Sequence, residues 1–178
     1  ARQERVEQLA STLRRELESL AGRINSKYAE VDWVPLRYIN KSIARPTLAG
    51  YYRLARVGLV TPLRDGMNLV AKEFIAARDD ELGVLILSQF TGAARELHEA
   101  LIINPYHIEQ GAQALYRALS MPEAEQRERM RSMRSRVRDF NVYRWAGLML
   151  LDAARLRRRQ RVTEKIHSHS RQALRRAS

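Results

Sequence analysis

Residues 57–77 read Val-Gly-Leu-Val-Thr-Pro-Leu-Arg-Asp-Gly-Met-Asn-Leu-Val-Ala-Lys-Glu-Phe-Ile-Ala-Ala. The run Val57–Val60 is continuously apolar, which predicts a strand buried on both faces. A Thr-Pro pair ends the run and a polar loop follows. Leu69–Ala77 then reads as a helix, and Asn68 stands where it can cap that helix. Strand, loop and helix in this order form the repeating unit of a parallel sheet.

The same alternation continues on both sides of this stretch. Further short apolar runs occur at Val34–Ile39, Val84–Leu87 and Leu101–Ile103. Helical patterns separate them, over approximately residues 6–24, 45–55, 93–98, 108–119, 122–137 and from 141 onward. Pro35 lies near the start of the first run, where proline is tolerated. The sequence therefore predicts an α/β protein with a Rossmann-like parallel sheet of about four strands, flanked by helices.

The first predicted helix carries one apolar stripe with spacings of three and four: Val6, Leu9, Leu13, Leu17, Leu20 and Ile24. Parallel sheets of this kind bind ligands where the carboxyl ends of the strands lead into helices. The search for a site therefore concentrates on the loops after Ile39, Val60, Leu87 and Ile103.

Composition excludes several classes of protein. The chain has 178 residues, a formal charge of +12 and no cysteine, so disulfide scaffolds and thiolate metal sites are excluded. No apolar run approaches the roughly 20 residues of a membrane span. Nine basic residues against Glu164 give +8 to residues 155–178, leaving +4 for the rest. This basic tail has no aromatic residue on which a base could stack, so nucleic acid is not the expected partner.

The loop after Val60 is the most informative candidate site. The first amides of the following helix lack internal partners, and a phosphate would satisfy them. Glu73 lies one turn along from Leu69 on the same face, where a carboxylate can accept hydrogen bonds from a ribose. Asp65 can accept from sugar hydroxyls, and Gly66 permits close approach of a ligand. These residues fit a nucleotide-sugar diphosphate, although spacing alone equally allows a structural turn followed by a surface charge.

The exact sequence of residues 61–74 favours a nucleotide-sugar site over a structural turn. Residues 61–74 resemble the donor-site signature of trehalose-6-phosphate synthases, which are retaining glycosyltransferases with two Rossmann-like domains. The resemblance covers approximately residues 13–145 and keeps the family's order. The further segments that carry it are Ala21–Asn25, Pro35–Asn40, Val57–Val60, Gly83–Phe90, Gly92–Ala94 and Ala100–Tyr106.

The resemblance implies roles for individual residues. Asp65 would hold hydroxyls of the donor glucose, as the one residue of the catalytic centre present in this chain. The amides of Gly66, Met67, Asn68 and Leu69 would cradle the diphosphate and the sugar. The remaining donor-site residues would be Val70, Ala71, Lys72 and Glu73, with Glu73 on the ribose of UDP. Ile43 falls where the family contacts the uracil. Arg2, or alternatively Arg5, would bind the phosphate of the acceptor. No metal site and no cofactor are predicted.

The implied reaction is glucosyl transfer from UDP-glucose to glucose 6-phosphate, giving α,α-trehalose 6-phosphate in the cytoplasm. Residues 1–146 would be the donor domain without its first strand, and residues 147–178 a final helix with an arginine-rich tail. The N-terminal domain of the enzyme is expected to be missing, since the chain opens on Ala1 within a helical pattern. We therefore expect this C-terminal part to be inactive alone and, with an unpaired sheet edge, to be marginally stable or to self-associate.

Two alternatives stay open at this stage. A glucosylglycerol-phosphate synthase or a pseudo-glycosyltransferase would share the donor site and differ in the acceptor. A non-catalytic module would use the basic tail on nucleic acid, and DNA binding lost on deletion of residues 155–178 would distinguish it.

Overall fold

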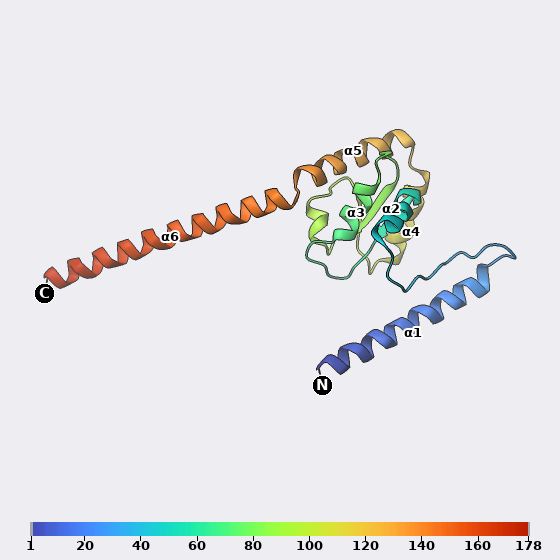
Figure 1. Cartoon of the computed structure of the whole chain (residues 1–178), viewed down its shortest axis with the longest axis horizontal. Helices are drawn as coiled ribbons and strands as arrows, with labels where there is room; N and C mark the ends of the chain where they lie inside the picture. The colour runs from blue at the N-terminus through green and yellow to red at the C-terminus, as the bar shows by residue number, and fades with distance from the viewer. Residues whose placement is uncertain (1, 178) are drawn as a thin grey trace. The chain divides into compact units, whose positions relative to one another are not determined.

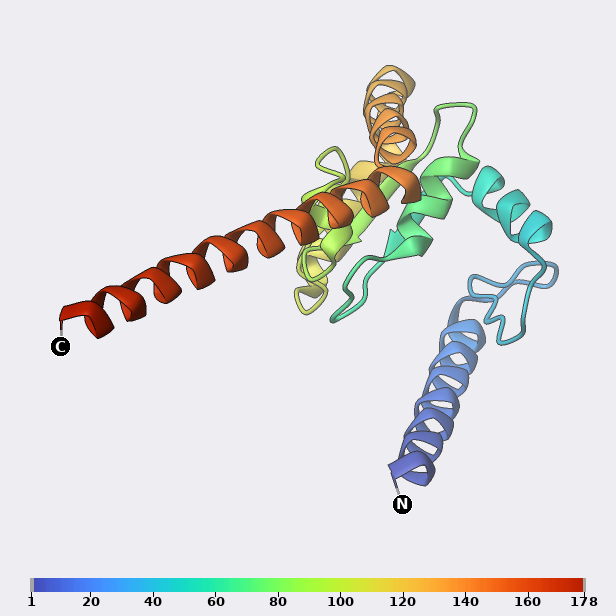
Figure 2. The ribbon, with the colours of Figure 1, turned by 60° about the vertical axis from the view of Figure 1, so that its left-hand side comes forward.

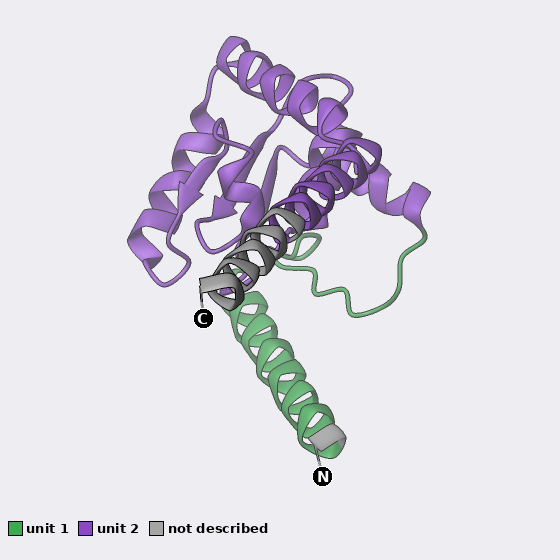
Figure 3. Cartoon of the chain, turned by 90° about the vertical axis from the view of Figure 1, so that its left-hand side faces the viewer, with its two compact units in different colours: residues 1–44 green, residues 45–178 purple. Residues whose placement is uncertain are grey.

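The computed structural model describes residues 2–177, with side chains described for residues 4–160. The chain divides into two compact units, residues 1–44 and 45–178, which Figure 3 colours separately. Each unit is considered by itself below.

The first unit contains one helix, α1 (Arg2–Tyr28), which confirms the helix predicted from the apolar stripe. The stripe is not covered within this unit, since Val6, Leu9, Leu13, Leu17 and Leu20 are each at least 44% exposed. The irregular segment after α1 is bonded to the end of that helix by the side chain of Asn25.

The side-chain amide group of Asn25 bonds the main chain of Leu36 in both directions. Its Nδ2 donates to the carbonyl oxygen of Leu36 at 2.9 Å, and its Oδ1 accepts from the Leu36 amide at 3.0 Å. The prediction of a strand at Val34–Ile39 is wrong, because no described strand pairs with this segment. A strand needs a hydrogen-bonded neighbour, and Pro35 has no amide to offer one.

The second unit contains the sheet, shown in Figure 1 and Figure 2. Its strands are β1 (Val57–Val60), β2 (Val84–Ser88) and β3 (Leu101–Ile103), parallel and in the order β1-β2-β3. Three of the four predicted strands are thus confirmed, and the described sheet has three strands rather than about four. Every residue of β2 is buried, whereas Leu59 on β1 is half exposed, as expected for an edge strand.

Helices cover both faces of the sheet, as predicted. The helices of this unit are α2 (Arg45–Leu54), α3 (Leu69–Ala77), α4 (Ile108–Ser120), α5 (Glu123–Asp139) and α6 (Val142–Ala177). Of these, α3 and α5 pack on one face of the sheet and α4 on the other. The helix predicted at 93–98 is a 3₁₀ turn, η1 (Gly92–Arg95). No helix in the described part of the chain is both long and apolar enough to cross a membrane.

The core divides into two clusters because successive residues of β2 point to opposite faces. Leu85 and Leu87 belong to a cluster with α3 and α5: Ala71, Phe74, Ile75, Leu85, Leu87, Ala93, Leu97, Ala100, Met130 and Met133. Val84 and Ile86 belong to a cluster with α4: Val84, Ile86, Leu101, Ile103, Ala114, Ala118 and Met121. The sheet is therefore the middle layer of three.

A buried arginine fixes the end of α2 against the start of β2. The guanidinium of Arg78, 4% exposed, donates to the carbonyl oxygens of Tyr52, Arg53 and Ala55. These carbonyls lie at the carboxyl end of α2, where no intrahelical donor remains. Asp80 balances the charge, with its Oδ2 3.1 Å from the Arg78 Nη2. Through Arg78, the segment that leads into β1 is joined to the end of α3 and to the turn before β2.

Candidate donor-binding site

The loop between β1 and α3 is held together by its own side chains. The Oδ1 of Asp65 accepts from the amides of Met67 at 3.1 Å and Asn68 at 3.0 Å. The Oδ2 of Asp65 accepts from the Nδ2 of Asn68 at 2.9 Å. The Oδ1 of Asn68 in turn accepts from the amide of Ala71 at 2.8 Å, which confirms Asn68 as the N-cap of α3. Asp65 and Asn68 thus form a relay that shapes the loop before any ligand arrives.

Asn68 adopts φ 62°, a left-handed conformation that asparagine tolerates better than most residues. The amide of Met67, together with the side chain and amide of Asn68, holds the pKa of the Asp65 carboxyl below its usual value. The carboxylate is therefore charged at neutral pH.

The loop after β2 supports this loop from below. The amide of Asp65 donates to the carbonyl oxygen of Phe90 at 3.2 Å, and the amide of Gly92 donates to the carbonyl oxygen of Asp65 at 3.1 Å. Thr91 forms a parallel bridge with Asp65 and caps η1, accepting from the amide of Ala94 at 3.2 Å. The main chain of Asp65 is therefore fixed on both sides by a neighbouring loop.

The amino end of α3 offers donors to a ligand. The amides of Leu69 and Val70 have no hydrogen-bond acceptor among the described residues, and both side chains are exposed. A phosphate placed there would accept a hydrogen bond from each amide, and the positive end of the helix dipole would stabilise its charge. Ala71 differs, because its side chain is fully buried in the core and its amide is bonded to Asn68.

Lys72 and Glu73 lie on different flanks of α3. The Nζ of Lys72 is 2.6 Å from the Oε2 of Glu96, in the segment after η1. Glu73 is exposed and faces α2. The pKa of Tyr52 on α2 is raised mainly because Tyr52 is partly buried, and the negative charge of Glu73 raises it further. Lys72 is therefore engaged in an ion pair, whereas Glu73 forms none among the described residues.

A cavity of about 620 Å³ adjoins the loop on the Lys72 side. Four predicted site residues line it together with Glu96, namely Gly66, Met67, Leu69 and Lys72. Its other wall is the junction of α5 and α6, formed by Val137, Phe140, Asn141, Val142, Trp145 and Leu148. The sequence alone does not predict this wall, because only long-range packing brings the junction of α5 and α6 to the loop.

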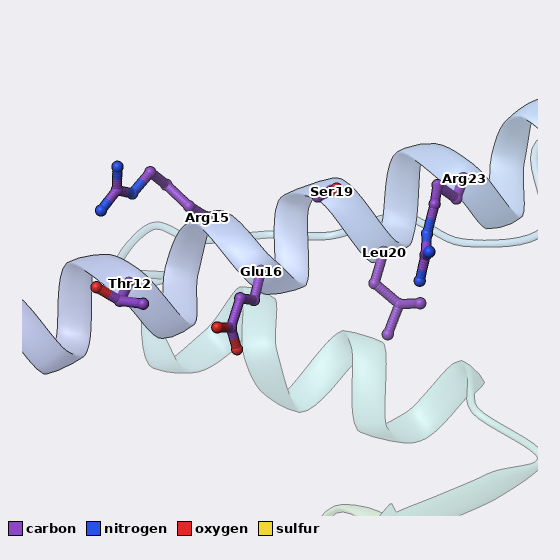
Figure 4. Close-up of a pocket in the computed structure, with 6 residues that line it drawn as sticks. All are labelled: Thr12, Arg15, Glu16, Ser19, Leu20 and Arg23. Carbon is purple, nitrogen blue, oxygen red and sulfur yellow. The ribbon is translucent and has the colours of Figure 1, made fainter.

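Three other predicted residues belong to the first unit. Ile43 belongs to the first unit, and so does Arg5, while the side chain of Arg2 lies outside the described residues. Figure 4 shows a depression in that unit whose lining residues all come from α1: Thr12, Arg15, Glu16, Ser19, Leu20 and Arg23. Within residues 4–160, no three His, Asp or Glu side chains gather as they would around a metal ion.

Comparison with known proteins places this loop in a family. The model of glycosyltransferase family 20 matches residues 1–155. The chain belongs to glycosyltransferase family 20. A trehalose-6-phosphate synthase from Sinorhizobium fredii is 55% identical over 141 residues, which make up 79% of this chain and 30% of that protein. The resemblance drawn from the sequence is thereby confirmed.

Solved structures of family 20 relatives agree with the fold. A UDP-forming α,α-trehalose-phosphate synthase from Burkholderia xenovorans, in complex with glucose-6-phosphate, superposes with a TM-score of 0.77 and 52% identity. The match covers 80% of this chain and 32% of the B. xenovorans chain. An E. coli structure bound with UDP-2-fluoro glucose has a TM-score of 0.77, 48% identity and the same two coverages. The chain spans about a third of these family members.

Proposed function

We propose that this chain is the donor-binding part of a retaining trehalose-6-phosphate synthase. The whole enzyme would transfer glucose from UDP-glucose to glucose 6-phosphate, giving α,α-trehalose 6-phosphate and UDP. The observation that carries the proposal is the loop of Asp65 and Asn68, already shaped and charged, in a chain 55% identical to such a synthase. Relatives bound to glucose-6-phosphate and to UDP-2-fluoro glucose support the two substrates.

The donor would lie across the amino end of α3. The exposed amides of Leu69 and Val70 would bind the diphosphate, and Glu73 would accept hydrogen bonds from the ribose hydroxyls. The Oδ1 of Asp65 already accepts two hydrogen bonds from the loop, whereas its Oδ2 accepts one and has a lone pair left for a further donor. Asp65 would therefore hold a glucose hydroxyl through Oδ2 from a fixed position.

The chemistry would be front-face substitution. The bond from the anomeric carbon to the diphosphate oxygen breaks, and a bond to the anomeric oxygen of the acceptor forms on the same face. The acceptor's proton passes to the departing diphosphate, so no residue of this chain acts as a base. Catalysis would then rest on positioning and on stabilising the leaving group, to which the amino end of α3 contributes.

The rest of the enzyme would supply the acceptor site. The chain spans 30% of the length of its relative from S. fredii, so we expect no trehalose 6-phosphate from this chain with both substrates. Product formed by the purified chain would contradict a division of the site between this part and the remainder. The cytoplasmic location, the self-association and the acceptor-phosphate role of Arg2 or Arg5 stay predictions.

Calorimetric titration with UDP tests the donor site directly. We expect the chain to bind UDP and Glu73→Ala to weaken binding about tenfold, since a charged hydrogen-bond acceptor contributes about 1.5–3 kcal/mol. Glu128→Ala is the matched control, because it removes the same charge from an exposed position of α5. Equal affinity of all three proteins would refute the role of Glu73.

A further inference from the structure

Gly92 lies directly against the backbone of the donor loop, the segment 61–68 between β1 and α3. A Cβ atom built on Gly92 would overlap the carbonyl oxygen of Gly66 and lie 3.0 Å from its carbonyl carbon. It would also lie 3.7 Å from the Cα of Met67. Gly66 itself has no atom within 4 Å of such a Cβ. The loop after β2, and not the donor loop, is therefore where space is lacking.

The reason for glycine at this position is space and not backbone conformation. Among the described glycines, Gly83 is the one with positive φ, so the φ of Gly92 suits any residue. The atoms that block a side chain at Gly92 are backbone atoms of Gly66 and Met67. A flexible side chain could rotate away, but main chain moves only if the loop moves.

We propose that Gly92 is a positioning residue of the donor site. By letting η1 lie directly against the donor loop, it allows its own amide to hold the carbonyl oxygen of Asp65 at 3.1 Å. The position of the Asp65 carboxylate, and of the amides of Met67 and Asn68 that it holds, follows from this contact. This role rests on the proposed function for its consequence, UDP binding, but not for the contact itself.

A second tie joins the same two segments. The ion pair of Lys72 with Glu96 connects α3 to the residues just after η1 at 2.6 Å. Thr91 holds the start of η1 through its hydroxyl, which accepts from Ala94, and Thr91 is 4% exposed. The segment 91–96 is thus held to the donor loop by main-chain hydrogen bonds at one end and to α3 by an ion pair at the other. A side chain at Gly92 would push apart the end that carries Asp65.

The test compares Gly92→Ala with Gly50→Ala in the full 178-residue chain. Gly50 lies in α2 with nothing within 4 Å of an added Cβ, so it controls for the loss of a glycine. We expect Gly92→Ala to raise the Kd for UDP at least tenfold and to speed amide hydrogen exchange at Asp65, Met67 and Asn68. We expect Gly50→Ala to change neither, and both variants to melt cooperatively. Wild-type affinity and exchange in Gly92→Ala would overturn the proposal.

The exchange measurement separates this proposal from the proposed function. If the wild-type chain binds no UDP, the proposed function fails, and faster exchange in Gly92→Ala alone still establishes the contact. If Gly92→Ala does not fold, Thr91→Val and Thr91→Ser replace it. The valine removes the hydroxyl that caps η1, so we expect faster exchange at Asp65 and weaker UDP binding, with serine restoring both. Identical behaviour of the two Thr91 variants would overturn the proposal.

Discussion

Residues 57–77 and residues 25–39 have similar local patterns and different fates. Both contain a short apolar run, and both use an asparagine side chain to bond the main chain. The run Val57–Val60 pairs with β2 and becomes part of a sheet, whereas Val34–Ile39 has no strand beside it within its unit. An apolar run therefore forms a strand only where a neighbouring strand supplies the other half of the hydrogen-bonded ladder.

The largest effect is expected from removing one isoleucine in each region. Ile75 on α3 is fully buried between the sheet and α5, so Ile75→Ala should cost about 2–5 kcal/mol of unfolding free energy. Ile39 is 48% exposed, so Ile39→Ala should change the stability of the chain by no more than about 0.5 kcal/mol. Urea denaturation of both variants measures the contrast. Equal losses would mean that residues 34–39 pack as a strand after all.

A smaller effect is expected from the two asparagines. Asn68→Ala removes the N-cap of α3 at a buried position and should cost about 1–2 kcal/mol. Asn25→Ala removes two hydrogen bonds that water can replace, so its cost should stay below about 1 kcal/mol. Thermal melts followed by circular dichroism compare the two. If Asn25→Ala cost more, the irregular segment would be a firmer part of the fold than its exposure indicates.

The smallest effect concerns pH and the donor loop alone. The pKa of Asp65 is lowered in the folded chain, so its hydrogen bonds are fully present above the ordinary carboxyl pKa of about 3.9. They are lost as the pH falls through the lower folded value. We expect faster amide exchange at Met67 and Asn68 in that acid range, with no such change in Asp65→Asn. A pH response identical in both proteins would assign it to another carboxylate.

Local sequence accounts for much of this fold. Three apolar runs, at Val57–Val60, Val84–Leu87 and Leu101–Ile103, predicted three strands, and the helix at Leu69–Ala77 was predicted together with its cap. Each of these depends on neighbours close in the chain or on a continuous apolar run. The prediction of a fourth strand at Val34–Ile39 was wrong because the local sequence does not show whether another strand lies beside it.

The sequence proposes the members of the candidate site, and the structure adds the contacts that support them. Asp65 was expected to hold sugar hydroxyls, with a structural turn as the open alternative, and in the structure its carboxylate shapes the loop. Gly92 lies far along the chain from Gly66, so only the fold brings the two backbones together. Glu81 pairs with Arg131 on α5, fifty residues along the chain. The Gly92 contact and the Glu81 pair depend on the fold, whereas the bonds of Asp65 join residues two and three apart and are local.

The relay from Asp65 through Asn68 to Ala71 also has a thermodynamic consequence. A loop that is already shaped loses little conformational entropy when a ligand arrives. The heat of UDP binding should therefore come from contacts with the nucleotide and not from ordering of protein, and the accompanying heat-capacity change should be small. Selectivity at such a loop arises from how well a ligand matches a fixed set of donors, so analogues with a displaced phosphate should lose affinity as enthalpy.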